Sequence, residues 1–138
     1  MYQLKTHYKK ILADTITPVS IYLKIRDKYP NSILLESSDY HTNDNSFSYI
    51  CCNPIASIKV ENDIISQTFP DGSTKTSSTD SNNVVDEIHK FTKRFKVDNE
   101  KSFKFINNGI FGFTAYDAVK YFEDISISKK VYQFTTLW

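Results

Sequence analysis

The sequence has little glycine, little cysteine and almost no net charge. Only 3 of its 138 residues are glycine and 2 are cysteine, and 17 basic residues stand against 16 acidic ones, which leaves a net charge of +1. A chain without a net field does not hold a polyanion or an anionic membrane by charge. We therefore expect neither nucleic acid nor membrane among its partners.

Long apolar runs are also missing. No stretch reaches the roughly 18 consecutive apolar residues that a spanning helix needs. The start, "MYQLKTHYKKILAD", lacks the ordered regions of a signal peptide. We expect a cytoplasmic protein. Since 40% of the residues are hydrophobic, the chain has enough apolar material for one core, and we predict a single domain over 1–138.

Residues that would mark a metal or catalytic site are sparse. Cys51 and Cys52 are adjacent, which disfavours a disulfide between them and gives no spaced pair for zinc, so we expect two buried strand thiols. The histidines His7, His41 and His89 lie far apart, and no nucleophile elbow, phosphate loop or dinucleotide motif is present. We predict no metal site and no catalytic residue in this chain.

Two segments carry helix signals. In "TPVSIYLKIRDKYP", Thr17 suits the cap, Pro18 suits the first helical position and Pro30 stops the run, which predicts a helix over about 18–29. A second, amphipathic helix is predicted from about residue 80 to about residue 95. Its apolar residues recur every three or four positions: Val84, Ile88, Phe91 and Phe95.

Most of the remaining sequence is typical of short strands. The runs are "YQLKTHYKKIL" (2–12), "SILLESS", "FSYICC", "IASIKVEN", "DIISQTF", "SFKFI" and "GIFGFTAY". A tight turn is predicted at Asn62-Asp63, another at "PDGS" (70–73), and a short helix at "YDAVKYFED". This order predicts an α+β fold, with a largely antiparallel sheet and two to three helices.

The stretch "LLESS" raises a question about function. An apolar run ends in the carboxylate of Glu36 and the hydroxyl of Ser37. The pattern fits a strand that leaves the core. It also fits half of a pocket for a small zwitterion, in which Glu36 faces an ammonium, Ser37 hydrogen-bonds it and Leu35 packs on an apolar side chain. The residues alone leave both interpretations open.

The stretch "NNGIFGFTAYDAVKYFE" (107–123) holds two of the three glycines. Gly109 and Gly112 stand inside a strand-like run, where glycine is costly unless the backbone bulges or another segment approaches closely. Both explanations stay open. Asp117 stands where a helix N-cap is expected, so we predict a structural role for its carboxylate.

Three segments together resemble a known family. "TPVSIYLKIRDKYPNSILLESSD", "SFSYICCNP" and "GIFGFTAYDAVKYFE" are similar to the N-terminal region of anthranilate synthase component I, a chorismate-utilising enzyme of tryptophan biosynthesis. The resemblance covers about residues 17–123. Residues 131–138 are atypical of the family. Aminodeoxychorismate synthase component I, a folate-pathway relative, has weaker versions of these segments and is the alternative.

The resemblance implies roles for particular residues. Leu35, Glu36 and Ser37 match the "LLES" segment that contacts the feedback inhibitor, L-tryptophan. A second matched group, the "GxxGYxxYD" element, implies a structural support near the core. Where many members have a basic residue near the inhibitor, this chain has Ser46. The matched residues of the structural element are Gly109, Gly112, Tyr116 and Asp117.

The resemblance also sets what this chain is expected to do. The family's chorismate site and its Mg²⁺-binding glutamates lie in a C-terminal domain that this chain does not contain. We therefore expect a regulatory and structural fragment that needs no cofactor and is inactive alone. The full enzyme is expected to make anthranilate and pyruvate from chorismate, with ammonia from a glutamine amidotransferase subunit, component II. A different class of function, a non-catalytic protein-interaction module, is a further alternative.

Overall fold

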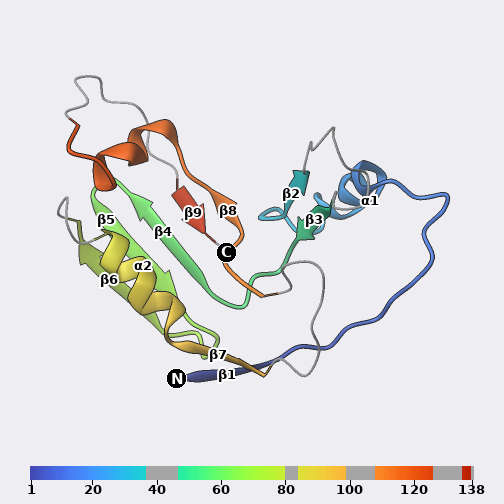
Figure 1. Cartoon of the computed structure of the whole chain (residues 1–138), viewed down its shortest axis with the longest axis horizontal. Helices are drawn as coiled ribbons and strands as arrows, with labels where there is room; N and C mark the ends of the chain where they lie inside the picture. Colours follow the sequence, from blue (N-terminus) through green and yellow to red (C-terminus); the bar gives the residue numbers. More distant parts are fainter. Residues whose placement is uncertain (37–46, 80–83, 99–107, 126–134, 138) are drawn as a thin grey trace. The chain divides into compact units, whose positions relative to one another are not determined.

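The computed structural model shows an α+β arrangement, as the sequence predicts (Figure 1). It describes residues 1–36, 47–79, 84–98, 108–125 and 135–137. In these ranges three sheets are formed, two of them antiparallel and one a parallel pair. The helices of the described part are α1 (Pro18–Ile25), α2 (Val84–Thr92) and the 3₁₀ helix η2 (Tyr116–Tyr121).

Contacts within the chain group into two compact units. Unit 1 comprises Met1–Thr6 and Ile55–Trp138, and unit 2 comprises His7–Pro54. The prediction of a single domain over 1–138 concerns how the whole chain folds, and it stays a prediction.

The five-stranded sheet of unit 1 is antiparallel throughout. Its strand order is β6-β5-β4-β9-β8. The strands are β4 (Ser57–Glu61), β5 (Ile64–Thr68), β6 (Thr74–Ser78), β8 (Gly112–Phe113) and β9 (Thr135–Leu137).

Local turn chemistry explains the hairpins of this sheet. Asn62 and Asp63 have positive φ angles of 49° and 58°, which is the type I′ geometry that matches strand twist, so the predicted tight turn is confirmed. Between β5 and β6, Gly72 has a φ of 79°, where a residue with a side chain is disfavoured. The Asp71 carboxylate accepts hydrogen bonds from the Ser73 backbone N–H at 2.9 Å and hydroxyl at 2.6 Å.

The core of unit 1 lies between this sheet and α2, which covers one of its faces (Figure 1). Burial alternates along β4 and β5, as expected where one face of an antiparallel sheet packs and the other meets solvent. The 3₁₀ helix η2 adds Ala118 and Tyr121 to this core. The buried hydrophobic residues are Ile58, Val60, Ile65, Phe69, Val84, Phe91, Ala118 and Tyr121.

A separate parallel pair joins the chain start to the segment after α2. β1 (Tyr2–Lys5) pairs in parallel with β7 (Phe95–Asp98), and the Tyr2 backbone N–H donates to the Arg94 carbonyl at 2.7 Å. The Tyr2 ring stacks on Phe69 and Phe95 with centroids 5.8 and 5.5 Å apart. The strand predicted over 2–12 is thus only four residues long, from Tyr2 to Lys5.

Unit 2 contains α1 and a two-stranded hairpin, β2 (Ile33–Glu36) with β3 (Ser48–Cys51). The predicted start of α1 is confirmed. The Thr17 hydroxyl accepts from the Ser20 backbone N–H at 3.1 Å, and the Ser20 hydroxyl oxygen accepts from the Thr17 N–H at 3.2 Å. The helix ends at Ile25, before the predicted end at 29. The next residues form a turn in which the Lys28 and Tyr29 N–H groups donate to the Ile25 carbonyl. Pro30 follows, and a proline disfavours helical geometry at the residue before it.

Several smaller predictions need correction. Cys51 is half-buried and Cys52 is exposed, because β3 ends at Cys51 and the chain leaves the strand there. The N-cap of η2 is Ala115, and Asp117 lies within the helix and is buried. Of "GIFGFTAY", only Gly112–Phe113 pairs as a strand. The strand predicted at "SFKFI" lies outside the described residues.

Candidate functional site

Strand β2 carries Leu34, Leu35 and Glu36, the described part of the "LLES" segment, and pairs with β3. Its register places Leu35 opposite Tyr49 and Glu36 opposite Ser48. Leu35 is half-buried and Glu36 is exposed. Ser37 and Ser46, the other two positions singled out in the sequence, lie outside the described residues.

Leu35 and Glu36 point to opposite faces of the hairpin, because neighbouring side chains of a strand alternate. One face presents Leu35 beside Tyr49, an apolar and aromatic pair. The other face presents the Glu36 carboxylate beside the Ser48 side chain. A ligand that touches both Leu35 and Glu36 must therefore wrap around the end or edge of β2.

The second predicted group lies in unit 1. Gly112 is in β8, opposite Leu137 of β9, and Gly109 precedes that strand. Tyr116 and Asp117 are neighbours in η2 with opposite environments, since Tyr116 is 90% exposed and Asp117 is 4% exposed. The structure thus places this group in a different unit from Leu35 and Glu36.

Asp117 is the buried member of that group. Both of its carboxylate oxygens lack a hydrogen-bond partner among the residues that the structure describes. Its neighbour Ala118 and, one turn further on, Tyr121 belong to the hydrophobic core. A buried polar group of this kind is costly to the fold.

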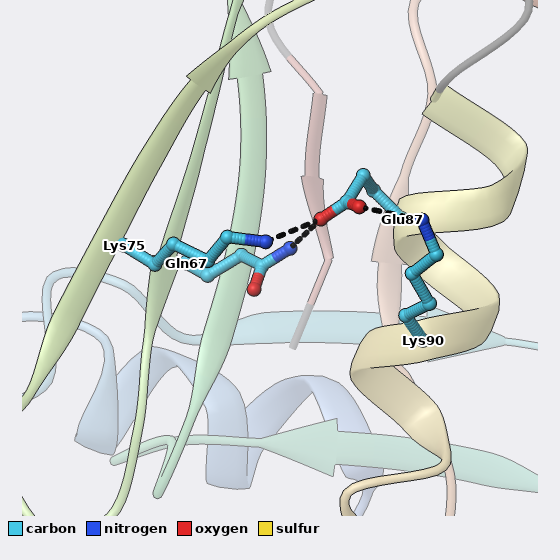
Figure 2. Close-up of polar contacts among 4 residues, drawn as sticks. All are labelled: Gln67, Lys75, Glu87 and Lys90. Carbon is cyan, nitrogen blue, oxygen red and sulfur yellow. Dashed lines mark hydrogen bonds and ion pairs between the residues drawn. The ribbon is translucent and has the colours of Figure 1, made fainter.

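A second buried acid, Glu87, was not singled out from the sequence. It lies on α2 and is 6% exposed. Figure 2 shows its carboxylate between the helix and the sheet, where Oε2 accepts from Gln67 Nε2 at 3.1 Å and pairs with Lys75 Nζ at 2.9 Å, while Oε1 pairs with Lys90 Nζ at 3.1 Å. The hydrogen bonds from the two lysines lower the pKa of Glu87 to about 2.

The sequence does contain a signal for this acid. Position 87 falls three residues after Val84 and four before Phe91, so it lies on the apolar stripe of α2. A charge on that stripe must find partners across the core. Lys75 and Lys90 favour the ionised form of Glu87, and its bonds to Gln67 and Lys75 link α2 to strands β5 and β6, so the arrangement has a structural role.

The described ranges contain neither a metal-binding cluster nor a helix that could span a membrane. No three His, Cys, Asp or Glu residues in those ranges gather closely enough to hold a metal ion. No helix in the described part is both long and apolar enough to cross a bilayer.

Comparisons with curated proteins return one protein name. The chain is 28% identical over 118 residues to anthranilate synthase component 1 of Aquifex aeolicus (strain VF5), which is 86% of this chain and 23% of that protein. It is 34% identical over 112 residues to the Pseudomonas putida protein, covering 81% of this chain and 22% of the relative. A third match, to the Lactococcus lactis subsp. lactis (strain IL1403) protein, has 41% identity over 58 residues, or 42% of this chain and 12% of the relative.

Two other comparisons give no match. No protein-family model matches the chain. No solved structure matches it either.

The fold and the matches agree on the class of protein. The chain is an α+β protein that resembles a synthase component over most of its own length. The particular resemblance is to anthranilate synthase component 1, which confirms the recognition made from the sequence. The chain spans less than a quarter of the length of the curated relatives it matches.

Proposed function

We propose that this chain is the N-terminal, non-catalytic part of an anthranilate synthase large subunit. The observation that carries the proposal is the pair of matches that take in 81% and 86% of this chain but only 22% and 23% of the relatives. A segment of that extent corresponds to one part of a larger enzyme. The names of the relatives favour anthranilate synthase over the folate-pathway alternative, aminodeoxychorismate synthase component I.

The regulatory half of the proposal concerns L-tryptophan. Leu35, Glu36 and Ser37 contribute part of the feedback site, and the remainder comes from the larger domain. The β2–β3 hairpin supports this role because it offers what a zwitterion with an apolar side chain needs. Leu35 and Tyr49 give an apolar surface on one face of the hairpin, and Glu36 gives an exposed carboxylate on the other face, so the ligand reaches both around the edge of β2 and its ammonium donates hydrogen bonds to Glu36.

The reaction itself belongs to the complete enzyme. In this proposal the complete large subunit, with Mg²⁺ in its catalytic domain, converts chorismate and ammonia to anthranilate and pyruvate. A glutamine amidotransferase subunit, component II, supplies the ammonia. This chain alone forms no anthranilate when it is incubated with chorismate, Mg²⁺ and an ammonium salt. Anthranilate fluorescence above the background of a protein-free control would contradict that expectation.

Tryptophan binding is tested by titration of the isolated chain. We expect L-tryptophan, but not L-phenylalanine, to shift the amide NMR signals of Leu35 and Glu36 in a saturable way. Glu36→Gln removes the negative charge that faces the ammonium and should weaken binding about tenfold. Glu61→Gln, the same change on an unrelated strand of unit 1, is the matched control and should leave the affinity unchanged.

Two further variants sharpen this test. Ser37→Ala should weaken binding by removing one hydrogen bond to the ligand. Ser46→Arg should strengthen it, because an arginine supplies the tryptophan carboxylate with the basic partner that this chain lacks. If the amide spectrum is dispersed but tryptophan shifts no signal, either in the original chain or in Ser46→Arg, the isolated chain does not bind tryptophan by itself.

A specific observation favours the second candidate, a protein-interaction module. Unit 1 exposes several large apolar side chains near β8 and η2, and clustered exposed apolar surface promotes association. Size-exclusion chromatography with light scattering tests this candidate, since a monomer at all concentrations would rule out an obligate self-association. The exposed side chains are Phe113, Tyr116, Phe122 and Ile125.

A further inference from the structure

Unit 1 contains an apolar pocket whose lining includes Gly109 of the predicted structural element and neither Leu35 nor Glu36 of the predicted tryptophan site. It has a volume of about 210 Å³ and lies where β1, the last turn of α2, β7 and the segment before β8 meet. Leu4, Phe91, Phe95, Val97 and Ile110 supply most of its apolar surface. All ten of its described lining residues belong to unit 1.

The two phenylalanines that line the pocket pack against other aromatic rings of unit 1. Phe91 and Phe95 meet edge to face with ring centroids 5.3 Å apart. Phe91 also packs against Phe69 at 5.6 Å, and Phe95 stacks on Tyr2 at 5.5 Å. Such contacts fix ring orientations, so the pocket is formed before any ligand enters.

The polar atoms of the described lining residues are few and neutral. The Asn108 amide donates to the Thr6 hydroxyl at 3.0 Å, and an amide has a second N–H that this bond does not use. The Thr92 hydroxyl donates to the His89 carbonyl at 2.9 Å, which leaves its oxygen lone pairs as acceptors. None of the ten described lining residues carries a charge. A charged ligand would therefore lose its hydration without compensation.

We propose that this pocket binds a small, flat, uncharged aromatic molecule with one hydrogen-bonding group. The size of the pocket supports this class, because a dry apolar cavity of about 150 Å³ is enough for benzene, and most drug-sized ligands need about 300 Å³ or more. The ring stacks against Phe91 and Phe95, and its polar group accepts the second N–H of Asn108. This inference is independent of the proposed tryptophan site, which lies in unit 2 and takes a zwitterion.

The test uses phenol and toluene as probes, because they have nearly the same shape and differ in one hydroxyl. Each is titrated into the 138-residue chain, followed by amide and methyl NMR. We expect saturable shifts centred on Leu4, Val97 and Ile110 for both probes, with nuclear Overhauser contacts from ligand ring protons to those methyl groups. Benzoate, which carries a charge, should produce no saturable shift at these positions.

Variants separate the polar anchor from the apolar pocket. Asn108→Ala should weaken phenol binding about fivefold and leave toluene binding unchanged, because only phenol uses the amide. Thr6→Val removes the amide's present partner without changing the lining, so it should leave phenol binding intact or strengthen it. Equal losses for phenol and toluene in Asn108→Ala would overturn the assigned anchor.

Filling the pocket tests its location. Ala56 lines the pocket, and Ala56→Phe should abolish binding of both probes. Ala13→Phe, the same change at an exposed position of unit 2, should leave both affinities unchanged. Absence of ring-to-methyl contacts in the original chain, or shifts that survive Ala56→Phe, would overturn the proposal. Either result would leave the tryptophan titration unaffected, so the two proposals fail separately.

Discussion

The two units of the chain differ in what they bury. All eight buried hydrophobic residues of the described part belong to unit 1. In the described part of unit 2, the one buried residue is a serine, Ser32, and α1 has no buried residue. Unit 2 instead exposes a series of large apolar side chains. They are Tyr8, Ile11, Leu12, Ile16, Val19, Ile21 and Leu23.

This difference bears on how each unit is stabilised. Burial of apolar surface is the dominant favourable term in folding, and it must exceed the loss of chain entropy. Unit 1 has a sheet, a covering helix and an aromatic cluster. Unit 2 has a short helix and a two-stranded hairpin, and both kinds of element are marginal alone in water. We infer that unit 1 supplies most of the chain's stability and that unit 2 opens more readily.

The largest expected effect comes from a large-to-small substitution in the core of unit 1. Ile65 is 0% exposed, and Ile65→Ala should lower the free energy of unfolding by about 4 kcal/mol, because it removes buried methyl groups and leaves a cavity. Ile64→Ala, the same change on the solvent face of β5, should cost less than about 1 kcal/mol. Urea denaturation followed by circular dichroism measures both.

The same substitution in unit 2 sharpens the comparison. Ile21 is on α1 and is 39% exposed, so Ile21→Ala should resemble Ile64→Ala and not Ile65→Ala. A loss for Ile21→Ala as large as that for Ile65→Ala would mean that unit 2 has a core of its own, and the distinction between the units would fail.

Glu87 gives unit 1 a dependence on acid that unit 2 should lack. The pKa of Glu87 is lowered from its usual 4.5 to about 2 in the folded chain, mainly by hydrogen bonds from Lys75 and Lys90. Because the folded-state pKa lies below the unfolded one, this stabilisation is complete above about pH 4.5 and is lost as the pH falls toward 2. Its size is at most about 3 kcal/mol.

Removing the charge tests that dependence. Glu87→Gln should destabilise unit 1 at pH 7 by about 2 kcal/mol, and should flatten the fall in stability between pH 5 and pH 2, measured by urea denaturation at each pH. Glu61→Gln serves as the control, since Glu61 is half-buried and pairs on the sheet surface with Lys59 of the same strand. An unchanged pH profile in Glu87→Gln would show that Glu87 does not govern acid stability.

Local features of the fold were predictable from the sequence, and long-range pairings were not. Three features depend only on residues that are close together in the sequence: the cap at Thr17, the turn at Asn62-Asp63 and the apolar stripe through Val84 and Phe91. A short stretch of sequence therefore contains everything needed to predict each of them. In contrast, the parallel pairing of β1 with β7 joins segments more than ninety positions apart, from Tyr2 to Phe95. No local pattern specifies such a partner.

The candidate site shows the same division. The residue pattern left two interpretations of "LLES" open, and the family resemblance assigned Leu35, Glu36 and Ser37 to the inhibitor. That Leu35 and Glu36 face opposite sides of β2 follows from the period of a strand, and was predictable once that strand was assigned. The partners of Glu87 were not, because Gln67 and Lys75 reach it from other strands across the core.

The smallest expected effect tests unit 2 from within. Thr17→Ala removes the cap of α1 and should cost about 1 kcal/mol. Because unit 2 has no hydrophobic core in its described part, that loss should stay local: amide hydrogen exchange should accelerate about fivefold in α1 and remain unchanged in β4 and β5. Thr15→Ala, an exposed threonine just before the helix, should change neither. Faster exchange throughout unit 1 in Thr17→Ala would instead mean that the two units unfold together, and the contrast in burial would then have no counterpart in stability.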